Sequence, residues 1–346
     1  MLDTIIRKNI QALKPYSSAR SEFKGEATVF LDANENGYGA AAGDYNRYPD
    51  PLQQVLKKQL GALKGLAPDQ IFVGNGSDEA IDLLLRATCN PGRDNILITT
   101  PGYGMYEVAA AINDTEVRKI LLDADFQPDV PAICQAADSN SKLLFLCSPN
   151  NPTGNLVRPE LLESLLATFP GLVVLDEAYI DYAAGHSWLP RLVQYPKLVI
   201  LQTLSKAWGM AGLRLGMAFA AAEIVAVLNK IKAPYNLSQP AAELGLAALA
   251  RQDWVAACTT LVNTERERLS LALQSYSFVQ RVYPSVANFL LLKVTDAGAL
   301  YQYLLLQGIV VRNRHGMPLC DQCLRITIGT AQENTTLLNA LDQYPS

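Results

Sequence analysis

The sequence predicts an α/β protein, in which a large domain with a mostly parallel sheet flanked by helices precedes a smaller α+β C-terminal domain. Continuous apolar runs that end in polar residues indicate strands buried on both faces, as in a parallel sheet covered by helices. Helical patterns separate these runs, which is the alternation of a doubly wound sheet. After about residue 275 the pattern changes to short strands around one helix, which is typical of an α+β unit.

Four apolar runs are the predicted strands of the parallel sheet. They are "NILITT" (95–100), "KLLFLCS" (142–148), "GLVVLDE" (171–177) and "KLVILQT" (197–203). The clearest helical patterns beside them are "DEAIDLLLRATC" (78–89) and "RPELLESLLATF" (158–169). Because the carboxyl ends of parallel strands meet at one edge of the sheet, we expect the chemistry of the protein at that edge.

The C-terminal part begins with a long helix-forming stretch over residues 240–274, in which Asp253 is expected to cap the second of two helices. Three strands follow, around a helix with the sequence "DAGALYQYLLLQ" (296–307). They are "VANFLLLKV" (286–294), "GIVVRNR" (308–314) and "CLRITIG" (323–329). We therefore predict an N-terminal arm over 1–30, a large domain over 31–250 and a small domain over 251–346.

The composition excludes several functional classes. Hydrophobic residues make up 49% of the chain and charged residues 18%, which argues against disorder. A net charge of -4 provides no basic surface for nucleic acid or an anionic membrane. No apolar run approaches the roughly 20 residues that a membrane helix needs. Residues 1–18 hold no continuous apolar core, so they are not expected to be a signal peptide, and the predicted location is the cytoplasm.

The six cysteines are expected to be reduced and mostly buried rather than to form a disulfide framework. Cys320 and Cys323 form a CxxC motif, but the chain has no second such motif, and His315 is the only histidine nearby. A zinc site needs about four ligands. We therefore predict no metal site, and we expect no redox use of this pair.

Polar residues follow the predicted strands at the edge where a ligand is expected. Lys206 comes just after the strand 197–203, in "TLSKAWGMAGLRLG" (203–216). Asp176 closes the strand 171–177 and Tyr179 follows it, while Asn151 lies in the turn "PNNPTG" (149–154). Each of them has an ordinary alternative explanation, since an acid can cap a helix and an asparagine can shape a turn.

A glycine-rich loop opens a helix in "FVGNGSDEAIDLL" (72–84), where Ser77 is the expected N-cap. Free N–H groups at such a helix start form an anion site, although ordinary capping is the alternative. The set of a strand-end lysine, an aspartate, an asparagine, a tyrosine and an anion cradle is the one that pyridoxal phosphate (PLP) chemistry needs. A lysine binds the cofactor aldehyde, and an acid keeps the pyridine nitrogen protonated.

These motifs resemble those of the fold-type I PLP aminotransferases. The shared segments are "SPNNPTG", "DEAY" and "TLSKAWGMAGLRLG". Further segments make the chain similar to the histidinol-phosphate aminotransferase family within that group: "KPYSSAR", "LDANEN", "NRYPDP", "GSDEAIDLLLRA", "PGYGMY" and "LRITIG". The resemblance runs from about Lys14 to Gly329, which is nearly the whole chain.

The resemblance implies a role for each residue at the strand ends. Lys206 is expected to be the Schiff-base lysine and to move the proton between the substrate Cα and the cofactor C4′. Asp176 would pair with the pyridinium nitrogen. Asn151 and Tyr179 would hydrogen-bond the phenolate oxygen of the ring, and Tyr103 would stack on the ring face.

The resemblance also implies a cradle for the cofactor phosphate at the start of the helix after the glycine-rich loop. Its expected members in the same chain are Ser77, Asp78, Thr203, Ser205 and Arg214. Tyr48 would reach this phosphate from the neighbouring subunit. A homodimer with shared active sites is therefore implied.

Arginines of the small domain are the expected substrate contacts. Arg325 lies among apolar strand residues, where a charge is costly without an anionic partner, and in the family this arginine holds the substrate carboxylate. Arg312 is expected to be a second anion contact and Arg314 the more exposed of the two, although Arg312 could be a solvated strand end. Tyr16 matches a position near the substrate phosphate, with packing on a dimer partner as its alternative.

The implied reaction is transamination between histidinol phosphate and the glutamate/2-oxoglutarate pair, with imidazole acetol phosphate and glutamate as substrates in reverse. Histidinol phosphate carries CH2–O–phosphate where an amino acid carries its α-carboxylate, so the same arginines can hold both anions. Aromatic amino acid aminotransferases and the threonine-phosphate decarboxylase are rival activities on the same fold. A PLP-binding regulatory domain is a further rival, which would need a DNA-binding extension and a basic surface.

Overall fold

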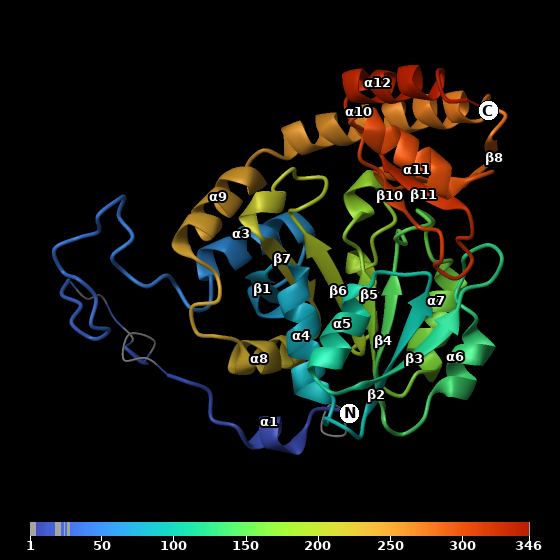
Figure 1. Cartoon of the computed structure of the whole chain (residues 1–346). Helices are drawn as coiled ribbons and strands as arrows, with labels where there is room; N and C mark the ends of the chain where they lie inside the picture. Colours follow the sequence, from blue (N-terminus) through green and yellow to red (C-terminus); the bar gives the residue numbers. More distant parts are fainter. Residues whose placement is uncertain (1–4, 18–21, 24, 26–27, 346) are drawn as a thin grey trace.

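The computed structural model describes the whole chain except residues 1–4, 18–21, 24, 26–27 and 346. Within the described part, a seven-stranded sheet with the order β1-β7-β6-β5-β4-β2-β3 forms the centre of the molecule (Figure 1). Its strands are β1 Ile71–Asn75, β2 Asn95–Thr100, β3 Glu116–Leu121, β4 Ser141–Cys147, β5 Leu172–Asp176, β6 Leu198–Thr203 and β7 Leu215–Phe219.

The strands from β6 to β3 are parallel, and β7 runs antiparallel to both of its neighbours. The four predicted apolar runs are confirmed as β2, β4, β5 and β6. Strands β1, β3 and β7 were not predicted. β3 has the sequence "EVRKIL" and lies at the edge of the sheet with partly exposed side chains, so it lacks the apolar pattern of a central strand.

Helices cover both faces of the large sheet. Alternate residues of each strand point to opposite faces, so Val173 and Leu175 belong to one buried cluster, and Leu172 and Val174 to another. The first cluster contains the helices α3 Gln54–Lys64, α6 Val130–Ala136, α7 Pro159–Thr168 and α9 Gln239–Leu249. The second contains α4 Ser77–Thr88, α5 Met105–Ile112 and α8 Ala222–Ile231. Short 3-10 helices lie at η2 Pro68–Gln70, η3 Ile180–Tyr182, η4 Leu189–Gln194 and η5 Ala211–Leu213.

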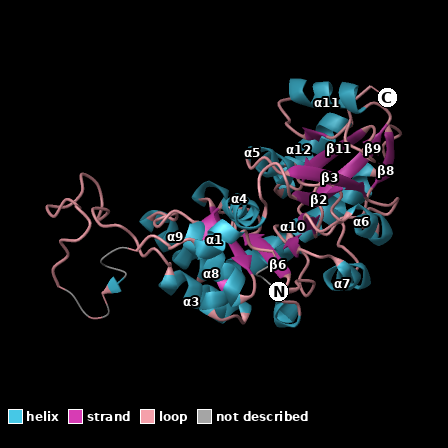
Figure 2. Cartoon of the chain, turned by 90° about the horizontal axis from the view of Figure 1, so that it is seen from below, coloured by secondary structure: helices cyan, strands magenta, loops and turns pink. Residues whose placement is uncertain are grey.

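The C-terminal part holds an antiparallel sheet with the order β10-β11-β9-β8, as the predicted α+β pattern requires (Figure 2). Its elements are α10 Gln252–Leu273, β8 Val279–Val282, β9 Phe289–Val294, α11 Ala297–Leu306, β10 Arg312–Asn313, β11 Cys323–Thr327 and α12 Ala331–Leu341. Asp253 is not the cap of α10: the N-cap is Arg251, and Asp253 lies in the first turn, where its charge favours the positive end of the helix dipole. The domain boundaries at 30/31 and 250/251 stay predictions.

The two faces of the small sheet have different neighbours. One face packs against α10, α11 and α12 through a buried cluster that includes Leu290, Leu292, Leu324 and Ile326. The opposite face carries Leu291 and Cys323, which pack with Leu122 and Phe126 of the large domain. This second face is therefore turned toward the large domain.

The N-terminal segment leaves apolar side chains exposed. After α1 (Lys8–Ala12), the chain between residues 28 and 48 extends away from the large sheet (Figure 1). Leu31 is 91% exposed and Tyr38 is 103% exposed. Part of the predicted arm over 1–30 lies outside the described residues. No helix in the described part combines the length and apolar character needed to cross a membrane.

Candidate active site

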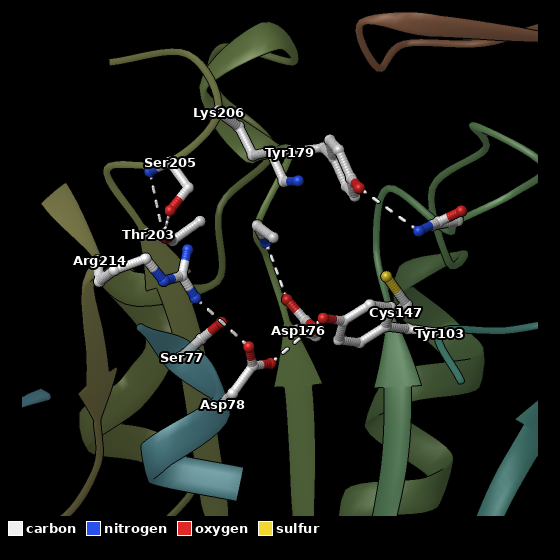
Figure 3. Close-up of a pocket in the computed structure, with 12 residues that line it drawn as sticks. Ser77, Asp78, Tyr103, Cys147, Asp176, Tyr179, Thr203, Ser205, Lys206 and Arg214 are labelled. Carbon is white, nitrogen blue, oxygen red and sulfur yellow. Dashed lines mark hydrogen bonds and ion pairs between the residues drawn. The ribbon is translucent and has the colours of Figure 1, made fainter. Parts of the chain in front are cut away.

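A cavity lies where the carboxyl ends of β5 and β6 meet the start of α4 (Figure 3). Strand ends that converge in this way are the usual ligand position of an α/β sheet. The lining residues are Ser77, Asp78, Tyr103, Cys147, Asn151, Asp176, Ala178, Tyr179, Thr203, Ser205, Lys206 and Arg214. The structure thus brings together every residue that was assigned to the cofactor from the same chain.

The start of α4 supplies backbone N–H groups that have no partner within the helix. Ser77 is not the N-cap: this position belongs to Gly76, whose φ of 78° favours glycine, and Ser77 is the first helical residue. A Cβ on Gly76 would lie 2.7 Å from Nη2 of Arg214, and a Cβ on Gly216 would lie 2.1 Å from the Ser77 nitrogen. The two glycines therefore allow close approach to the helix start, which suits an anion.

Hydroxyl groups and one guanidinium surround this helix start. Nη2 of Arg214 lies 3.5 Å from Oδ2 of Asp78, and Tyr103 donates a hydrogen bond of 3.2 Å to the other oxygen of the same carboxylate. The hydroxyl oxygens of Thr203, at the end of β6, and Ser205, on the loop after it, lie 3.0 Å apart (Figure 3). A cation, two hydroxyls and a helix N-terminus together form a site for a phosphate group.

Asp176 is a buried carboxylate at the end of β5, with 3% of the residue exposed. Its Oδ2 accepts a hydrogen bond of 2.7 Å from Tyr106, and its Oδ1 accepts one of 3.0 Å from the backbone N–H of Ala178. Burial raises the pKa of Asp176, while these two hydrogen bonds oppose the rise. A buried carboxyl without an ion-pair partner among the described residues is a site for a cation.

Lys206 extends into the cavity from the loop after β6. Its Nζ lies 5.4 Å from the centre of the Tyr179 ring, and it has no hydrogen-bond partner among the described residues. Burial and then the positive charge of Arg325 lower the pKa of Lys206. A lysine with a lowered pKa is neutral more often at physiological pH, and the neutral amine is the nucleophilic form.

A chain of hydrogen bonds leads from the cavity to the small domain. Nδ2 of Asn151 lies 3.4 Å from the Tyr179 hydroxyl, and Oδ1 of Asn151 accepts a hydrogen bond of 2.6 Å from Nη1 of Arg325. The guanidinium carbon of Arg325 also lies 5.2 Å from the centre of the Phe289 ring. Arg325 therefore lies beside the cavity, and its expected contact with the substrate anion stays a prediction.

The expected exposure of the two other arginines is reversed. Arg312 is the exposed residue, and Arg314 is half-buried. Arg312 lies directly opposite Arg325 in the β10–β11 pairing. Arg314 follows the two-residue strand, and its N–H donates to the carbonyl of Cys323 at 2.9 Å, which places it beside the buried cluster that contains Cys323.

Residues 21–341 match the model of the family described as aminotransferase class I and II. The chain belongs to this family. A histidinol-phosphate aminotransferase from Parabacteroides distasonis is 53% identical over 340 residues, covering 98% of each chain. One from Bacteroides thetaiotaomicron is 51% identical over 345 residues, covering 99% of each chain. A solved histidinol-phosphate aminotransferase from Sinorhizobium meliloti, in complex with PLP, has a TM-score of 0.79 and 27% identity, covering 89% of this chain and 88% of that one.

Aminotransferases of this class depend on PLP. The residues of the cavity fit this cofactor. The buried Asp176 carboxylate suits a protonated ring nitrogen, and the helix start beside Gly76 and Gly216 suits a phosphate. Between these two positions, Lys206 offers a free amine for the cofactor aldehyde.

Two of the residues that the sequence assigned to this aminotransferase site lie away from the cavity within the same chain. Tyr48 is half exposed and stacks on Tyr235, with ring centres 4.4 Å apart. Tyr16 is 72% exposed and lines a separate hollow with Lys230 and Lys232. The sequence segment around Tyr16, "KPYSSAR", continues into positions 18–20, which are outside the described residues.

Sequence analysis missed two residues of the aminotransferase site. Tyr106 is fully buried and donates to Asp176, and burial raises its pKa well above the usual range. Cys147 ends β4 and lines the cavity. The motif "PGYGMY" contains Tyr106, but only the packing of α5 on the sheet brings this residue next to Asp176. Cys147 is the next-to-last residue of the predicted strand 142–148, where no site role was assigned to it.

The CxxC motif lies outside this cavity. Cys320 and Cys323 are buried against Leu122, Phe126 and Leu291, and four of the six cysteines are buried, as expected. Among the described residues, no group of three or more histidine, cysteine, aspartate or glutamate side chains could hold a metal ion.

Proposed function

We propose that this protein transfers an amino group between histidinol phosphate and 2-oxoglutarate, with PLP as its cofactor; imidazole acetol phosphate and glutamate are the substrates in reverse. The observation that carries the proposal is the convergence of Lys206, Asp176 and a phosphate cradle in one cavity, with Arg325 beside it. The relatives at about 50% identity, which are named histidinol-phosphate aminotransferases, support it further. Its place in histidine biosynthesis and in the cytoplasm is part of the same proposal.

Most of the residues that line the cavity would hold the cofactor. Asp176 would bind the ring nitrogen, and Asn151 and Tyr179 would hydrogen-bond the ring oxygen. Tyr103 would cover one face of the ring. The phosphate would be held by the first N–H groups of α4 and by the side chains of Ser77, Thr203, Ser205 and Arg214, with Asp78 orienting the guanidinium.

PLP supplies an aldehyde that condenses with amines and a protonated ring that withdraws electrons from the bond to be broken. The chain supplies the proton transfer. Neutral Nζ of Lys206 would accept the proton that leaves the substrate Cα, and its lowered pKa increases the share of this neutral form. Tyr106 and the Ala178 N–H both stabilise the ionised form of Asp176, which is the form that would bind the protonated ring nitrogen.

The substrate anion would bind the arginines of the small domain. Arg325 is already fixed by Asn151, so its remaining N–H groups have a defined direction. Arg312 lies opposite it on β10. The phosphate of histidinol phosphate and the α-carboxylate of glutamate would occupy this position in turn, which lets one site serve both half-reactions.

The purified holoenzyme is expected to use histidinol phosphate with a kcat/KM at least about tenfold above that for phenylalanine or tyrosine, because the phosphate accepts more charged hydrogen bonds than a carboxylate. Steady-state kinetics with 2-oxoglutarate as acceptor measures this ratio. Arg325→Leu should weaken both histidinol phosphate and glutamate, since both anions use it. Arg312→Leu should have a smaller effect.

Other outcomes of this measurement would change the proposed activity. Equal or faster turnover of an aromatic amino acid would assign the protein to the aromatic aminotransferases. Release of carbon dioxide from threonine phosphate would assign it to the decarboxylases of the same fold.

We propose further that the protein acts as a homodimer in which Tyr48 completes the site of the partner subunit. Within one chain Tyr48 stacks on Tyr235 and does not line the cavity. The segment that carries it also exposes Val29, Leu31 and Tyr38, which a second chain would cover. A dimer of this kind has two sites, each formed by both chains.

Mixed dimers test the shared site. If subunits with Tyr48→Phe and Lys206→Ala exchange at equal concentration, half of the dimers are hybrids, and each hybrid has one intact site. Activity should then recover to about a quarter of the wild-type value. Mixing Lys206→Ala with Asp176→Asn is the control: both residues belong to the same chain's site, so no intact site forms. No recovery in the first mixture, with hybrids confirmed by mass spectrometry, would contradict a role of Tyr48 across the interface.

A further inference from the structure

Three arginines lie on the same face of the small sheet. Arg312 and Arg325 are directly paired across β10 and β11, and directly paired residues project to the same side. Arg314 lies two positions after Arg312, and its N–H donates to the Cys323 carbonyl at 2.9 Å, so the pairing continues to this residue. Side chains two positions apart share a face. Arg314 therefore belongs to the same face as the other two arginines.

This face is turned toward the large domain. Leu291, which pairs with Arg325 on β9, packs with Cys323 against Leu122 and Phe126 of the large domain. Arg325 itself reaches Asn151 at the cavity. The helices of the small domain pack on the opposite face, so they do not separate Arg314 from the cavity side.

Arg314 has the features of a ligand-binding arginine. Its Nε is buried without a hydrogen-bond partner, and the Nε of Arg325 is in the same state. Among the described residues, neither they nor Arg312 form an ion pair with a carboxylate. Burial and then the charges of Arg325 and Arg312 lower the pKa of Arg314 to about 10. A group of cations with unused N–H donors is stabilised by an anion.

We propose that Arg314 is a third guanidinium of the substrate site, and that it selects a phosphate monoester over a carboxylate. The inference rests on the proposed function and adds a specificity residue to it. Arg325 with one neighbouring guanidinium is enough for the two oxygens of a carboxylate. A phosphate monoester has three terminal oxygens and up to two negative charges, so it can use the third guanidinium as well.

The test compares Arg314→Gln with the wild-type holoenzyme. Loss of a hydrogen bond between charged groups corresponds to roughly a 10- to 100-fold change in affinity. We therefore expect the Kd for inorganic phosphate, measured by calorimetry on the PLP-loaded enzyme, to rise about tenfold or more. The KM for histidinol phosphate should rise by a similar factor, whereas the KM for glutamate should change by less than about threefold. The constants of Arg314→Lys should fall between those of the wild type and those of Arg314→Gln, because lysine keeps the charge but lacks the planar guanidinium group.

The matched control is Arg281→Gln. Arg281 is an exposed arginine on β8, which two strands, β9 and β11, separate from β10, and its guanidinium carbon lies 4.7 Å from the centre of the Tyr283 ring. The variant removes the same charge and should leave all of these constants unchanged. If Arg314→Gln unfolds in a thermal melt, Arg314→Lys carries the comparison of phosphate with glutamate alone.

Two results would overturn the inference: equal losses for phosphate and glutamate, or no loss for either. Failure of the proposed function has a different signature. Phosphate binding that depends on Arg314, in an enzyme that does not turn over histidinol phosphate, would refute the function and support the anion site. Turnover of histidinol phosphate with phosphate binding unaffected by Arg314→Gln would refute only the inference.

Discussion

Replacing Lys206 with alanine is expected to lower the rate of transamination by roughly 10⁴-fold or more, because one side chain supplies both the covalent attachment point and the general base. Its Nζ extends into the cavity with no partner among the described residues, and its pKa is lowered. Single-turnover kinetics on the PLP-loaded variant measures the loss. Borohydride reduction of the wild-type protein should place a pyridoxyl group on the peptide that contains Lys206.

Lys57 provides a demanding control for this assignment. It is buried too, and burial lowers its pKa to about 8, but it lies on α3 and donates a hydrogen bond to Asn229 instead of lining the cavity. Lys57→Met should retain wild-type turnover. If the pyridoxyl label falls on Lys57 or any other lysine, Lys206 does not bind the cofactor and the proposed site is wrong.

Residues next to an apolar strand could be predicted because the strand itself fixes their position. Lys206 follows the run that became β6 and Asp176 ends β5, and parallel neighbours end at the same edge of the sheet. The sequence pattern alone therefore placed both residues at one edge. The family resemblance then added their roles.

Other features depend on contacts between distant segments, which one sequence does not reveal. Tyr106 is 70 residues from Asp176, and only the packing of α5 on the sheet brings its hydroxyl to the carboxylate. The N-cap is Gly76 and not Ser77, at a position where Arg214 and Gly216 from a distant part of the chain lie close to this loop. Strand β7 was missed because its antiparallel position between β1 and β6 breaks the expected alternation.

The exposure of the arginines shows the same limit at the level of single residues. Alternation along a strand puts Arg312 and Arg314 on one face, so their sequence positions do not distinguish them. They differ in exposure: Arg312 lies on β10, whereas Arg314 lies after the end of β10, at the start of the turn that leads to the buried Cys320. We infer that this turn determines which of the two guanidinium groups is covered.

Changing Asp176 to asparagine is expected to leave PLP bound but to lower kcat/KM by a factor of a hundred or more, on the order of 3 kcal/mol of transition-state stabilisation. Asparagine preserves the shape and can still accept a hydrogen bond from the Ala178 N–H, so the charge is the main loss. The cofactor ring nitrogen would no longer be held in its protonated form. Absorbance spectroscopy checks that the cofactor remains, and steady-state kinetics measures the loss.

Tyr106→Phe is the matched comparison, because it removes one hydrogen bond to Asp176 and keeps the charge. This bond stabilises the ionised carboxylate and lowers its pKa, so its removal raises the pKa further. As pH falls, the variant should therefore bind the inactivating proton at a higher pH than wild type, and the acid limb of its kcat/KM profile should shift upward. At pH values above the acid limb, kcat/KM of the variant should be only about tenfold below that of the wild type, as expected for the loss of one hydrogen bond to a charged group. An unshifted acid limb, together with near wild-type turnover by Asp176→Asn, would mean that Asp176 only orders the turn after β5.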